Sequence, residues 1–513
     1  MFDVAIIGAG VIGTFITREL SRYQLKVALI EKDNDVANGT TKANSAIVHA
    51  GYDANPGTNK AKFNALGNIM FEKICEELDV PFKRTGSLVI ASNEDEMNTL
   101  KILYEQGIQN NIPNMELIDK EKVKILEPNI NEEIVAALYA PTCGIVGPFE
   151  LAIALAENAV ENDAELFLNS KVVSIDKAQD HYIINKGNNE IKAKFVINCA
   201  GVYADIINNM VARPSFKIIP RRGQYFIFDK KAGKLVNTVI FQCPTRIGKG
   251  VVVTQTVHGN LLVGPNAESL DDNENIQTTT MGLDEVRNAS YRTSKKIPFN
   301  SVITSFSGLR ATATTGDFII EESKEAPNFI NVAGIESPGL SAAPAIAEYV
   351  VEILNKKAHG LVKKEDFNPI RRKVIRFMKL SDTEKAEVIK KDPKYGRIIC
   401  RCESITEGEI VDAIKRKAGA TTLDGVKRRA RPGMGICQGA FCGPRIVEIL
   451  ARELKIDPLK ILKSNKETYV LVGKTKENAT KETTLNEPTP KKTASINEDI
   501  KMNTIEKEMQ GGE

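Results

Sequence analysis

The stretch from Phe2 to Lys32 constrains the fold of this chain more than any other. It reads FDVAIIGAGVIGTFITRELSRYQLKVALIEK: a short apolar run leads into three glycines, an amphipathic segment follows, and a second apolar run ends at Glu31. This order predicts a strand, a tight turn, a helix and a second strand. The glycines have the G-x-G-x-x-G spacing that, in such a setting, is typical of a dinucleotide-binding site.

Four residues of this stretch have separate roles in such a site. Gly8 allows the tight turn, Gly10 lets a pyrophosphate approach the backbone, and Gly13 lets the helix pack on the strand. The helix N-terminus offers free N–H groups and the positive end of its dipole to the phosphates. Glu31 follows Gly13 by 18 residues, where its carboxylate can accept hydrogen bonds from a ribose hydroxyl. We therefore predict a Rossmann-type dinucleotide-binding domain.

Length and composition indicate a globular protein of several domains. The chain has 513 residues, of which 42% are hydrophobic and 26% are charged, so it can bury an ordinary core. Its net charge of +3 is too small to indicate a nucleic-acid partner. We find no apolar run long enough for a transmembrane segment. We expect no signal peptide, since Asp3 interrupts the secretory pattern. We expect a cytoplasmic protein, and peripheral contact with the inner face of a membrane stays open.

Patterns typical of α/β units recur along the chain. Helices are expected at 60–78, 94–110 and 147–162. The stretch FINVAGIESPGLSAAPAIAEYVVEIL reads as a strand, a glycine-rich turn and a long helix. A nicotinamide-binding Rossmann domain is usually contiguous, so such separated pieces favour another cofactor.

Strand-rich stretches lie between these units. Residues 166–198 read as a three-stranded meander that leads into a second glycine turn at Gly201. Residues 251–265 read as a hairpin with His258 as an exposed turn residue. These stretches indicate a second domain that is interleaved with the first.

Four of the eight cysteines cluster near the C-terminus. Cys400 and Cys402 are one residue apart, and Cys437 and Cys442 follow after 34 residues. In a reducing compartment such a cluster is more often metal-binding than disulfide-bonded. Neither pair has the C-x2-C spacing that zinc sites usually show, so the pattern favours a [2Fe–2S] cluster, with zinc as the alternative.

A basic stretch lies between the two cysteine pairs. Its charged side chains belong to Lys427, Arg428, Arg429 and Arg431. They could offset the negative charge of a cluster, dock an electron-transfer partner, or form only a solvated basic turn.

A flavin that accepts a hydride and a cluster that passes electrons singly would together let the chain oxidise an organic substrate and export the electrons.

These motifs resemble a known family. GAGVIG with Glu31, TTKANSAIVHAG, VINCAG, GLRA and GIESPGLSAAPAIAEYV are similar to the D-amino-acid-oxidase-type FAD oxidoreductases, and within them to the flavin-dependent glycerol-3-phosphate dehydrogenases. ICRCESITEGEI and GMGICQGAFCGPR resemble the [2Fe–2S] domain of bacterioferritin-associated ferredoxin. TTKANSAIVHAGYD and GSLVIAS also resemble the L-2-hydroxyglutarate oxidases.

The resemblance assigns cofactor-binding residues. They are Gly8, Gly10, Gly13 and Glu31 for the ADP half of FAD; Thr40, Thr41, Ser45 and Ala46 along the phosphates and flavin; Val173 at the adenine; Gly334, Pro338, Gly339 and Leu340 at the isoalloxazine edge; Lys32 and Gly201 as further cofactor contacts; and Cys400, Cys402, Cys437 and Cys442 at the cluster.

The resemblance implies two catalytic residues and a reaction. His49 would act as a base near the flavin, and Arg310 would hold the anionic group of the substrate, with Arg221, Arg222 and Arg246 as competitors. The implied reaction oxidises sn-glycerol 3-phosphate to dihydroxyacetone phosphate and passes electrons through the cluster to a partner subunit or quinone. A 2-hydroxy acid such as 2-hydroxyglutarate is the alternative substrate, and an electron-transfer subunit without its own substrate is the alternative function. The residues Lys42-Ala43-Asn44-Ser45 depart from the glycerol-3-phosphate pattern.

The expected fold class is α/β, with a Rossmann-type FAD-binding domain interleaved with a mixed or antiparallel-sheet substrate domain and followed by a small helical iron–sulfur domain. The expected segments are 1–80, 146–214 and 301–355 for FAD binding; 81–145 and 215–300 for the substrate domain; 356–398 for a helical linker; 399–452 for the [2Fe–2S] domain; 453–473 for an extension with a short helix and strand; and 474–513 for a disordered tail.

Overall fold

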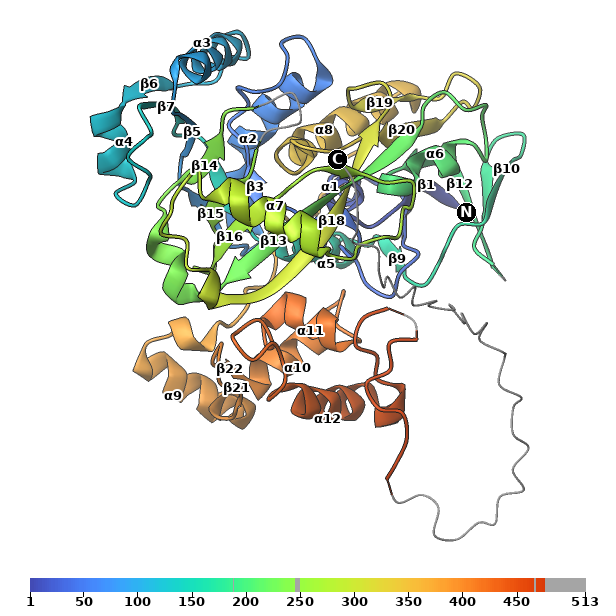
Figure 1. Cartoon of the computed structure of the whole chain (residues 1–513). Coiled ribbons are helices and arrows are strands. Elements are labelled where there is room, and N and C mark those ends of the chain that lie inside the picture. The colour runs from blue at the N-terminus through green and yellow to red at the C-terminus, as the bar shows by residue number, and fades with distance from the viewer. Residues whose placement is uncertain (188, 245–249, 466, 476–513) are drawn as a thin grey trace, which may run out of the picture. The chain divides into compact units, whose positions relative to one another are not determined.

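A computed structural model describes residues 1–187, 189–244, 250–465 and 467–475 of the chain. Residues 1–471 form one compact unit (Figure 1). Nearly all of the predicted tail at 474–513 lies outside the described residues. Among the residues described, no helix is both long and apolar enough to cross a bilayer.

The first sheet contains the strand–turn–helix–strand unit predicted from the glycine motif. The strand β1 (Phe2–Ile7) leads through the glycine turn into the helix α1 (Val11–Leu20), and β2 (Val27–Ile30) pairs in parallel with β1. The sheet has the order β10-β11-β12-β1-β2-β9, with β20 beside β12 and β19 beside β20. The other strands are β9 (Glu165–Phe167), β10 (Ser174–Lys177), β11 (Tyr182–Asn185), β12 (Glu190–Asn198), β19 (Ile319–Glu322) and β20 (Phe329–Ala333).

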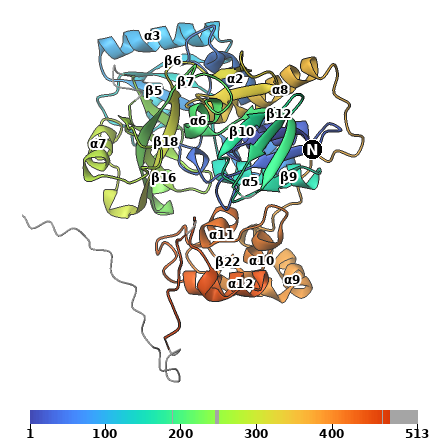
Figure 2. The ribbon, with the colours of Figure 1, turned by 90° about the vertical axis from the view of Figure 1, so that its right-hand side faces the viewer.

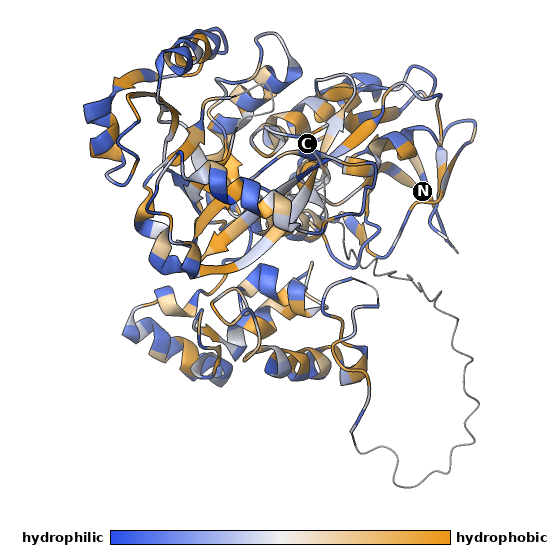
Figure 3. Cartoon of the chain, in the orientation of Figure 1, coloured by the Kyte–Doolittle hydropathy of each residue, from blue (hydrophilic) through white to orange (hydrophobic). Residues whose placement is uncertain are grey.

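Three helices pack with α1 to bury the main hydrophobic core. They are α2 (Asn59–Glu77), α5 (Pro148–Glu161) and α8 (Gly339–Lys357). β1 and β2 are almost continuously apolar, as expected for parallel strands that are covered on both faces. In Figure 3 the apolar segments gather in the strands of the sheets, whereas α3 (Glu94–Gln109) carries many polar residues.

The second sheet is mostly antiparallel and has the order β17-β13-β16-β15-β14-β5-β7-β6. β18 pairs with β13 over almost its whole length. Its strands are β5 (Ser87–Ala91), β6 (Glu116–Asp119), β7 (Ala136–Ala140), β13 (Ile218–Phe228), β14 (Val239–Gln242), β15 (Val252–Gln255), β16 (Leu261–Gly264), β17 (Glu268–Ser269) and β18 (Val302–Ala313). The helices α4 (Lys120–Leu126) and α7 (Thr280–Ser290) pack on this sheet, and a short sheet of β3 (Ile47–Val48), β8 (Gly144–Val146) and β4 (Phe82–Arg84) lies apart from it.

The C-terminal domain is a small helical bundle around a two-stranded hairpin. The strands β21 (Ile398–Cys400) and β22 (Ile405–Thr406) pair, and α10 (Glu407–Lys415), α11 (Leu423–Ala430) and α12 (Gly443–Leu454) surround them (Figures 1 and 2). Its own core includes Ile410, Val426 and Leu450. The fold class predicted from the sequence is therefore confirmed.

Several local predictions differ from the structure. The stretch at 356–398 is not a helical linker: beyond the end of α8, only α9 (Asp382–Lys391) is α-helical there, and most of the chain before α9 has no regular secondary structure. Residues 166–198 are not one meander, because β9 pairs in parallel with β2 while β10, β11 and β12 form the meander. β18 falls in the predicted third FAD-binding segment, yet it belongs to the second sheet. The extension after α12, which ends at Leu454, contains a 3₁₀ turn at Pro458–Lys460 and a single β-bridge.

Candidate active site

A cavity of about 1,030 Å³ brings most of the predicted cofactor residues together. Its walls come from the turn after β1, the end of β2, the loop at 38–49, residues 169–173 and 199–210, the middle of β18, and the turn between β20 and α8. Every predicted FAD contact lines it except Gly13, and His49 and Arg310 line it as well. Segments that are far apart in the sequence therefore meet at the carboxyl ends of the parallel strands, where α/β sheets bind ligands.

Two of the three motif glycines, Gly8 and Gly13, occupy places where a side chain would collide. Gly8 has φ +107°, and a Cβ there would lie 2.4 Å from the carbonyl oxygen of Cys199. A Cβ on Gly13 would lie 1.9 Å from the carbonyl oxygen of Gly8, so the helix could not approach the strand. Gly10 faces the cavity, and a Cβ there would lie 3.2 Å from Thr41 Oγ1. The backbone thus keeps a cradle open at the N-terminus of α1, which fits a pyrophosphate.

Glu31 and Thr41 brace this cradle. The Glu31 carboxylate accepts hydrogen bonds from the backbone N–H of Ala9 (2.8 Å) and of Asp33 (3.0 Å). Burial raises the pKa of Glu31 against these hydrogen bonds. Thr41 Oγ1 accepts a hydrogen bond from the N–H of Val11 (2.9 Å) at the start of α1. Both side chains thus fix the turn, and Glu31 keeps further lone pairs for a ribose hydroxyl.

The loop that carries Thr40, Ser45 and Ala46 is held against the second sheet. Thr40 Oγ1 donates to the carbonyl oxygen of Leu309 in β18 (2.6 Å). Ala46 adopts φ +62°, and its N–H donates to Asn44 Oδ1 (2.8 Å). The hydrogen bond of Thr40 therefore fixes this loop to β18 of the second sheet.

At the other end of the cavity, α8 begins beside His49. Gly334 has φ +69° and follows β20, and Pro338, Gly339 and Leu340 lead into α8. The backbone N–H of His49 donates to Ser341 Oγ (2.7 Å), and its ring lies 5.4 Å from that of Phe241. His49 and the start of α8 thus line the same cavity.

Of the four candidate arginines, the structure places Arg310 in the cavity wall. Its guanidinium donates to the carbonyl oxygen of Asn266 (3.2 Å). Arg222 is buried and forms an ion pair with Glu268 (2.7 Å), so it serves the fold. Arg221 lies opposite Arg310 in the sheet register but outside the cavity lining. Arg246 lies outside the described residues.

Three other predicted cofactor residues, Val173, Gly201 and Lys32, also line the cavity. Val173 lines the cavity, and its N–H already donates to the carbonyl oxygen of Asn185 (2.9 Å), which leaves its carbonyl group for a ligand. Gly201 has φ +58° at the turn after β12. Lys32 lies over the ring of Tyr203, 5.0 Å from its centroid.

His258 is not the exposed turn residue we expected, because its Nε2 pairs with the buried Glu150 at 2.9 Å.

Sequence reasoning missed several residues that line the cavity. They are Lys42, Asn44, Tyr203, Tyr225, Ser307 and Asn465 among others. The alternation in RRGQYFIF would have pointed to one face of β13 and hence to Tyr225. No sequence signal indicates Asn465, which reaches the cavity rim from beyond the C-terminal domain.

The four clustered cysteines converge as two pairs. The sulfur atoms of Cys402 and Cys437 are 3.6 Å apart. The hydrogen bond from Cys442 lowers the pKa of Cys400 to about 6 although burial opposes this, and the pKa of Cys442 is raised in turn. Backbone hydrogen bonds from Phe441 and Gly439 also lower the pKa of Cys437, so each pair contains one thiol with a lowered pKa. Two such pairs fit a centre with two irons that each take two thiolates.

The arginines of the basic stretch beside the cysteines form ion pairs within the molecule. Arg428 and Arg429 both pair with Asp35 of the cofactor domain at 2.7 Å, and all three side chains are buried. Arg431 pairs with Glu403 (3.3 Å). The expectation that this stretch docks an external partner, or is a solvated turn, is therefore wrong for these three arginines.

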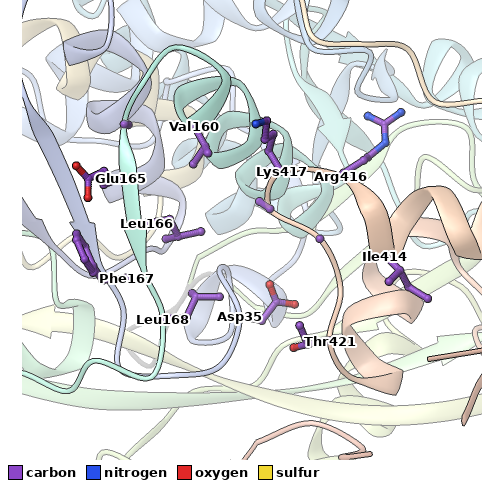
Figure 4. Close-up of a pocket in the computed structure, with 13 residues that line it drawn as sticks. Asp35, Val160, Glu165, Leu166, Phe167, Leu168, Ile414, Arg416, Lys417 and Thr421 are labelled. Carbon is purple, nitrogen blue, oxygen red and sulfur yellow. The ribbon is translucent and has the colours of Figure 1, made fainter. Parts of the chain in front are cut away.

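A second cavity of about 580 Å³ lies where the C-terminal domain meets β9 and α5 (Figure 4). Leu166 and Leu168 line it on one side, and Ile414, Lys417 and Thr421 line it on the other. None of the predicted site residues lies in its wall.

Comparisons with known proteins agree with this geometry. Residues 3–353 match the family described as FAD dependent oxidoreductase. The chain belongs to the FAD-dependent oxidoreductases. In this oxidoreductase, residues 398–452 also match the BFD-like [2Fe–2S] binding domain, and all four clustered cysteines fall within that match. Its cofactors are therefore FAD and a [2Fe–2S] cluster. The cradle formed by Gly8, Gly10 and Gly13 fits the pyrophosphate of FAD.

Three relatives of this oxidoreductase bear on its substrate. It is 59% identical to a glycerol 3-phosphate dehydrogenase from Caloramator mitchellensis over 93% of this chain and 99% of that protein. It is 32% identical to an L-2-hydroxyglutarate dehydrogenase from Indibacter alkaliphilus over 56% of this chain and 72% of that protein. The solved structure of an L-α-glycerophosphate oxidase from Mycoplasma pneumoniae with FAD bound superposes with a TM-score of 0.69 and 34% identity, covering 72% of this chain and 98% of that one.

Proposed function

We propose that this oxidoreductase oxidises sn-glycerol 3-phosphate to dihydroxyacetone phosphate. The observation that carries the proposal is the full-length likeness to the Caloramator protein, which includes the region of the [2Fe–2S] domain. The cavity supports it, because one anion-binding side chain and one imidazole line the same space. The likeness to the 2-hydroxyglutarate enzyme covers only part of the chain, so that substrate ranks second.

Arg310 and His49 have the central roles in this reaction. FAD, when bound, supplies the two-electron acceptor for the hydride that leaves C2 of the substrate. The guanidinium of Arg310 would bind the phosphate of the substrate, for which its planar donors are suited. His49 would take the proton of the C2 hydroxyl as the hydride leaves. The hydrogen bond from the His49 backbone to Ser341 fixes the loop that positions the imidazole.

The cofactor residues divide by position along the cavity. Gly8, Gly10, Glu31 and Thr41 would hold the ADP half, where the N-terminus of α1 faces the diphosphate. The remaining contacts would run from the adenine to the isoalloxazine edge through Lys32, Thr40, Ser45, Ala46, Val173, Gly201, Gly334, Pro338, Gly339 and Leu340. The start of α8 would place free N–H groups at the flavin edge.

Electrons would leave through the [2Fe–2S] cluster. Cys400, Cys402, Cys437 and Cys442 would hold it, and the buried ion pairs of Asp35 keep its domain against the FAD-binding loop. The final acceptor would be a partner protein or a quinone. The third function is an electron-transfer subunit without a substrate. We rank it last, because such a subunit would not need the anion-binding Arg310 in the cavity wall.

An anaerobic visible spectrum tests the proposal directly. We expect glycerol 3-phosphate to bleach the flavin absorbance of the purified protein. If 2-hydroxyglutarate bleaches it and glycerol 3-phosphate does not, the second substrate is correct. If neither compound bleaches a bound flavin, the proposal fails.

The variant Arg310→Ala tests the substrate site. Loss of a hydrogen bond to a charged group costs about 1.5–3 kcal/mol, so kcat/KM should fall roughly tenfold to hundredfold, mainly through KM, while FAD stays bound. Arg221→Ala is the matched control, because Arg221 occupies the opposite register position outside the cavity. Equal kinetics of both variants would contradict the assignment.

A further inference from the structure

The cysteine pairs differ sharply in their access to solvent. Cys400 and Cys442 are buried, whereas Cys402 is exposed and Cys437 is half-buried. Since Cys402 and Cys437 are adjacent, the cluster has one edge at the surface. Electrons that reach the cluster can leave at this edge without any rearrangement of the domain.

Two large apolar side chains stand beside the exposed edge. Ile436 directly precedes Cys437 and is 68% exposed, and Phe441 directly precedes Cys442 and is 53% exposed. The domain has a buried core, and Ile398 at 47% is a further large apolar side chain of the domain that is exposed. Exposed apolar side chains that are gathered around a reactive group, and not scattered singly, mark an interaction site.

Two exposed arginines lie close in sequence to the clustered cysteines, and the exposed Glu448 lies one turn beyond the second of them on α12. The guanidinium of Arg401 lies over the ring of Phe441, 4.9 Å from its centroid, and Arg445 is exposed in the first turn of α12. In the part of the chain that the structure describes, neither arginine has an ion pair with a carboxylate. The acid next in sequence to Cys402, Glu403, is buried and already paired with Lys230 (2.9 Å) and Arg431 (3.3 Å).

We propose that Arg401, Ile436, Phe441 and Arg445, together called the cluster rim, bind a small acidic one-electron carrier protein. This inference rests on the proposed function and names the partner class. Opposite charge steers such a carrier to the rim and sets its orientation, while the two apolar side chains supply a small dry contact. The modest size suits electron transfer, where complexes form and separate quickly.

The rim favours a carrier protein over other occupants. A second copy of the chain would present the same arginines, and like charges would face each other. A membrane would need a larger apolar surface, such as an amphipathic helix, whereas the apolar face of α12 is buried in the domain core. Three basic side chains of the stretch between the cysteine pairs, Arg428, Arg429 and Arg431, form ion pairs with Asp35 and Glu403 and add nothing to the rim.

The electron count sets the stoichiometry. Oxidation of the substrate alcohol to the ketone releases two electrons and two protons. Two oxidised carriers each gain one electron at the rim, one after the other, and both protons pass to solvent. Each carrier must therefore dissociate before the next binds, which agrees with a small contact.

Stopped-flow reduction of two carriers of opposite charge tests the rim. Oxidised rubredoxin serves as the acidic probe and cytochrome c as the basic probe, each mixed anaerobically with the reduced enzyme. We expect fast reduction of rubredoxin that slows roughly tenfold when salt screens the charges, and slow reduction of cytochrome c. Faster reduction of cytochrome c than of rubredoxin at low salt would overturn the proposal.

Charge-reversal variants locate the effect. Arg401→Glu and Arg445→Glu should each slow rubredoxin reduction roughly tenfold and speed cytochrome c reduction. Lys101→Glu, on the helix α3 that packs on the second sheet, reverses a charge remote from the cluster and should leave both rates unchanged. Phe441→Ser should slow rubredoxin reduction without changing its salt dependence. Rates in both rim arginine variants that equal those of Lys101→Glu would refute the rim.

Two measurements keep this test separate from the proposed function. The visible spectrum of each variant must show an intact cluster, and Arg445 serves where Arg401, next to Cys402, disturbs it. Flavin bleaching by glycerol 3-phosphate should be unchanged in every rim variant. If glycerol 3-phosphate does not bleach the flavin, the proposed function fails, but the rim can still be tested. The enzyme is then reduced with dithionite before it is mixed with rubredoxin or cytochrome c. Loss of binding to anionic vesicles in Arg401→Glu, with unchanged rubredoxin rates, would assign the rim to a membrane and overturn the proposal.

Discussion

Asp35 offers the sharpest test of how the two cofactor domains are held together. Its carboxylate is 4% exposed and pairs with Arg428 and with Arg429, each at 2.7 Å. It also accepts a hydrogen bond from the N–H of Val36 (2.9 Å). Burial acts to raise the pKa of Asp35, but Arg429 and Arg428 outweigh it and hold the pKa below its usual value.

The variant Asp35→Ala leaves two buried guanidinium groups without their counter-ion. Breaking a buried ion pair from one side costs about 3–5 kcal/mol, since the remaining charge is uncompensated. We expect a loss of that size in the free energy of unfolding, measured by urea denaturation and circular dichroism. The matched control is Glu116→Ala, which breaks the exposed pair with Lys122 and should cost less than about 1 kcal/mol.

The sign of the pH dependence is set by the lowered pKa. A group with a depressed pKa stabilises the fold above its unfolded pKa, and this contribution is lost as pH falls through the folded value. The wild-type protein should therefore lose stability at acid pH more steeply than Asp35→Ala. A triple variant with apolar residues at positions 35, 428 and 429 should recover part of the loss. An Asp35→Ala protein that is as stable as the control would refute the reasoning.

Three further variants test the cofactor sites. Gly13→Ala should lose FAD, read as the ratio of flavin to protein absorbance, because its Cβ would meet the carbonyl oxygen of Gly8 at 1.9 Å; full flavin content would contradict the cradle. Thr41→Val removes the acceptor of the Val11 N–H, so we expect about 1 kcal/mol less stability and weaker FAD binding by fluorescence titration; unchanged values would show that the cap is dispensable. Cys402→Ser should abolish the cluster spectrum and retain FAD, whereas Cys243→Ser, outside the cluster, should keep both; a cluster that survives in Cys402→Ser would refute the ligand set.

Much of the first domain could be read from the sequence because its signals are local. The spacing of Gly8, Gly10 and Gly13 is typical of a particular turn, and the structure shows the collisions that a side chain would cause at Gly8 and Gly13. The spacing of the four cysteines likewise pointed to a metal centre before any fold was known. Periodicity located α2, α3 and α5 to within a residue or two.

What the sequence could not decide depended on contacts between distant segments. β18 reads like part of an α/β unit, yet its pairing with β13 assigns it to the second sheet. His258 reads like an exposed turn residue, because nothing near it in sequence announces Glu150. The basic stretch reads like compensation for the cluster's charge, a docking surface or a solvated turn until Asp35, nearly 400 residues away, is found between Arg428 and Arg429.

The sequence by itself indicated a dinucleotide site and a metal centre, because glycine and cysteine spacing expresses backbone geometry and metal ligation within short segments. Only the tertiary structure decided which arginine faces the cavity, which basic groups are consumed by internal ion pairs, and which edge of the cysteine cluster faces solvent. The physical reason is that burial and pairing of a charge are properties of its surroundings, and those surroundings come from parts of the chain that no local pattern connects.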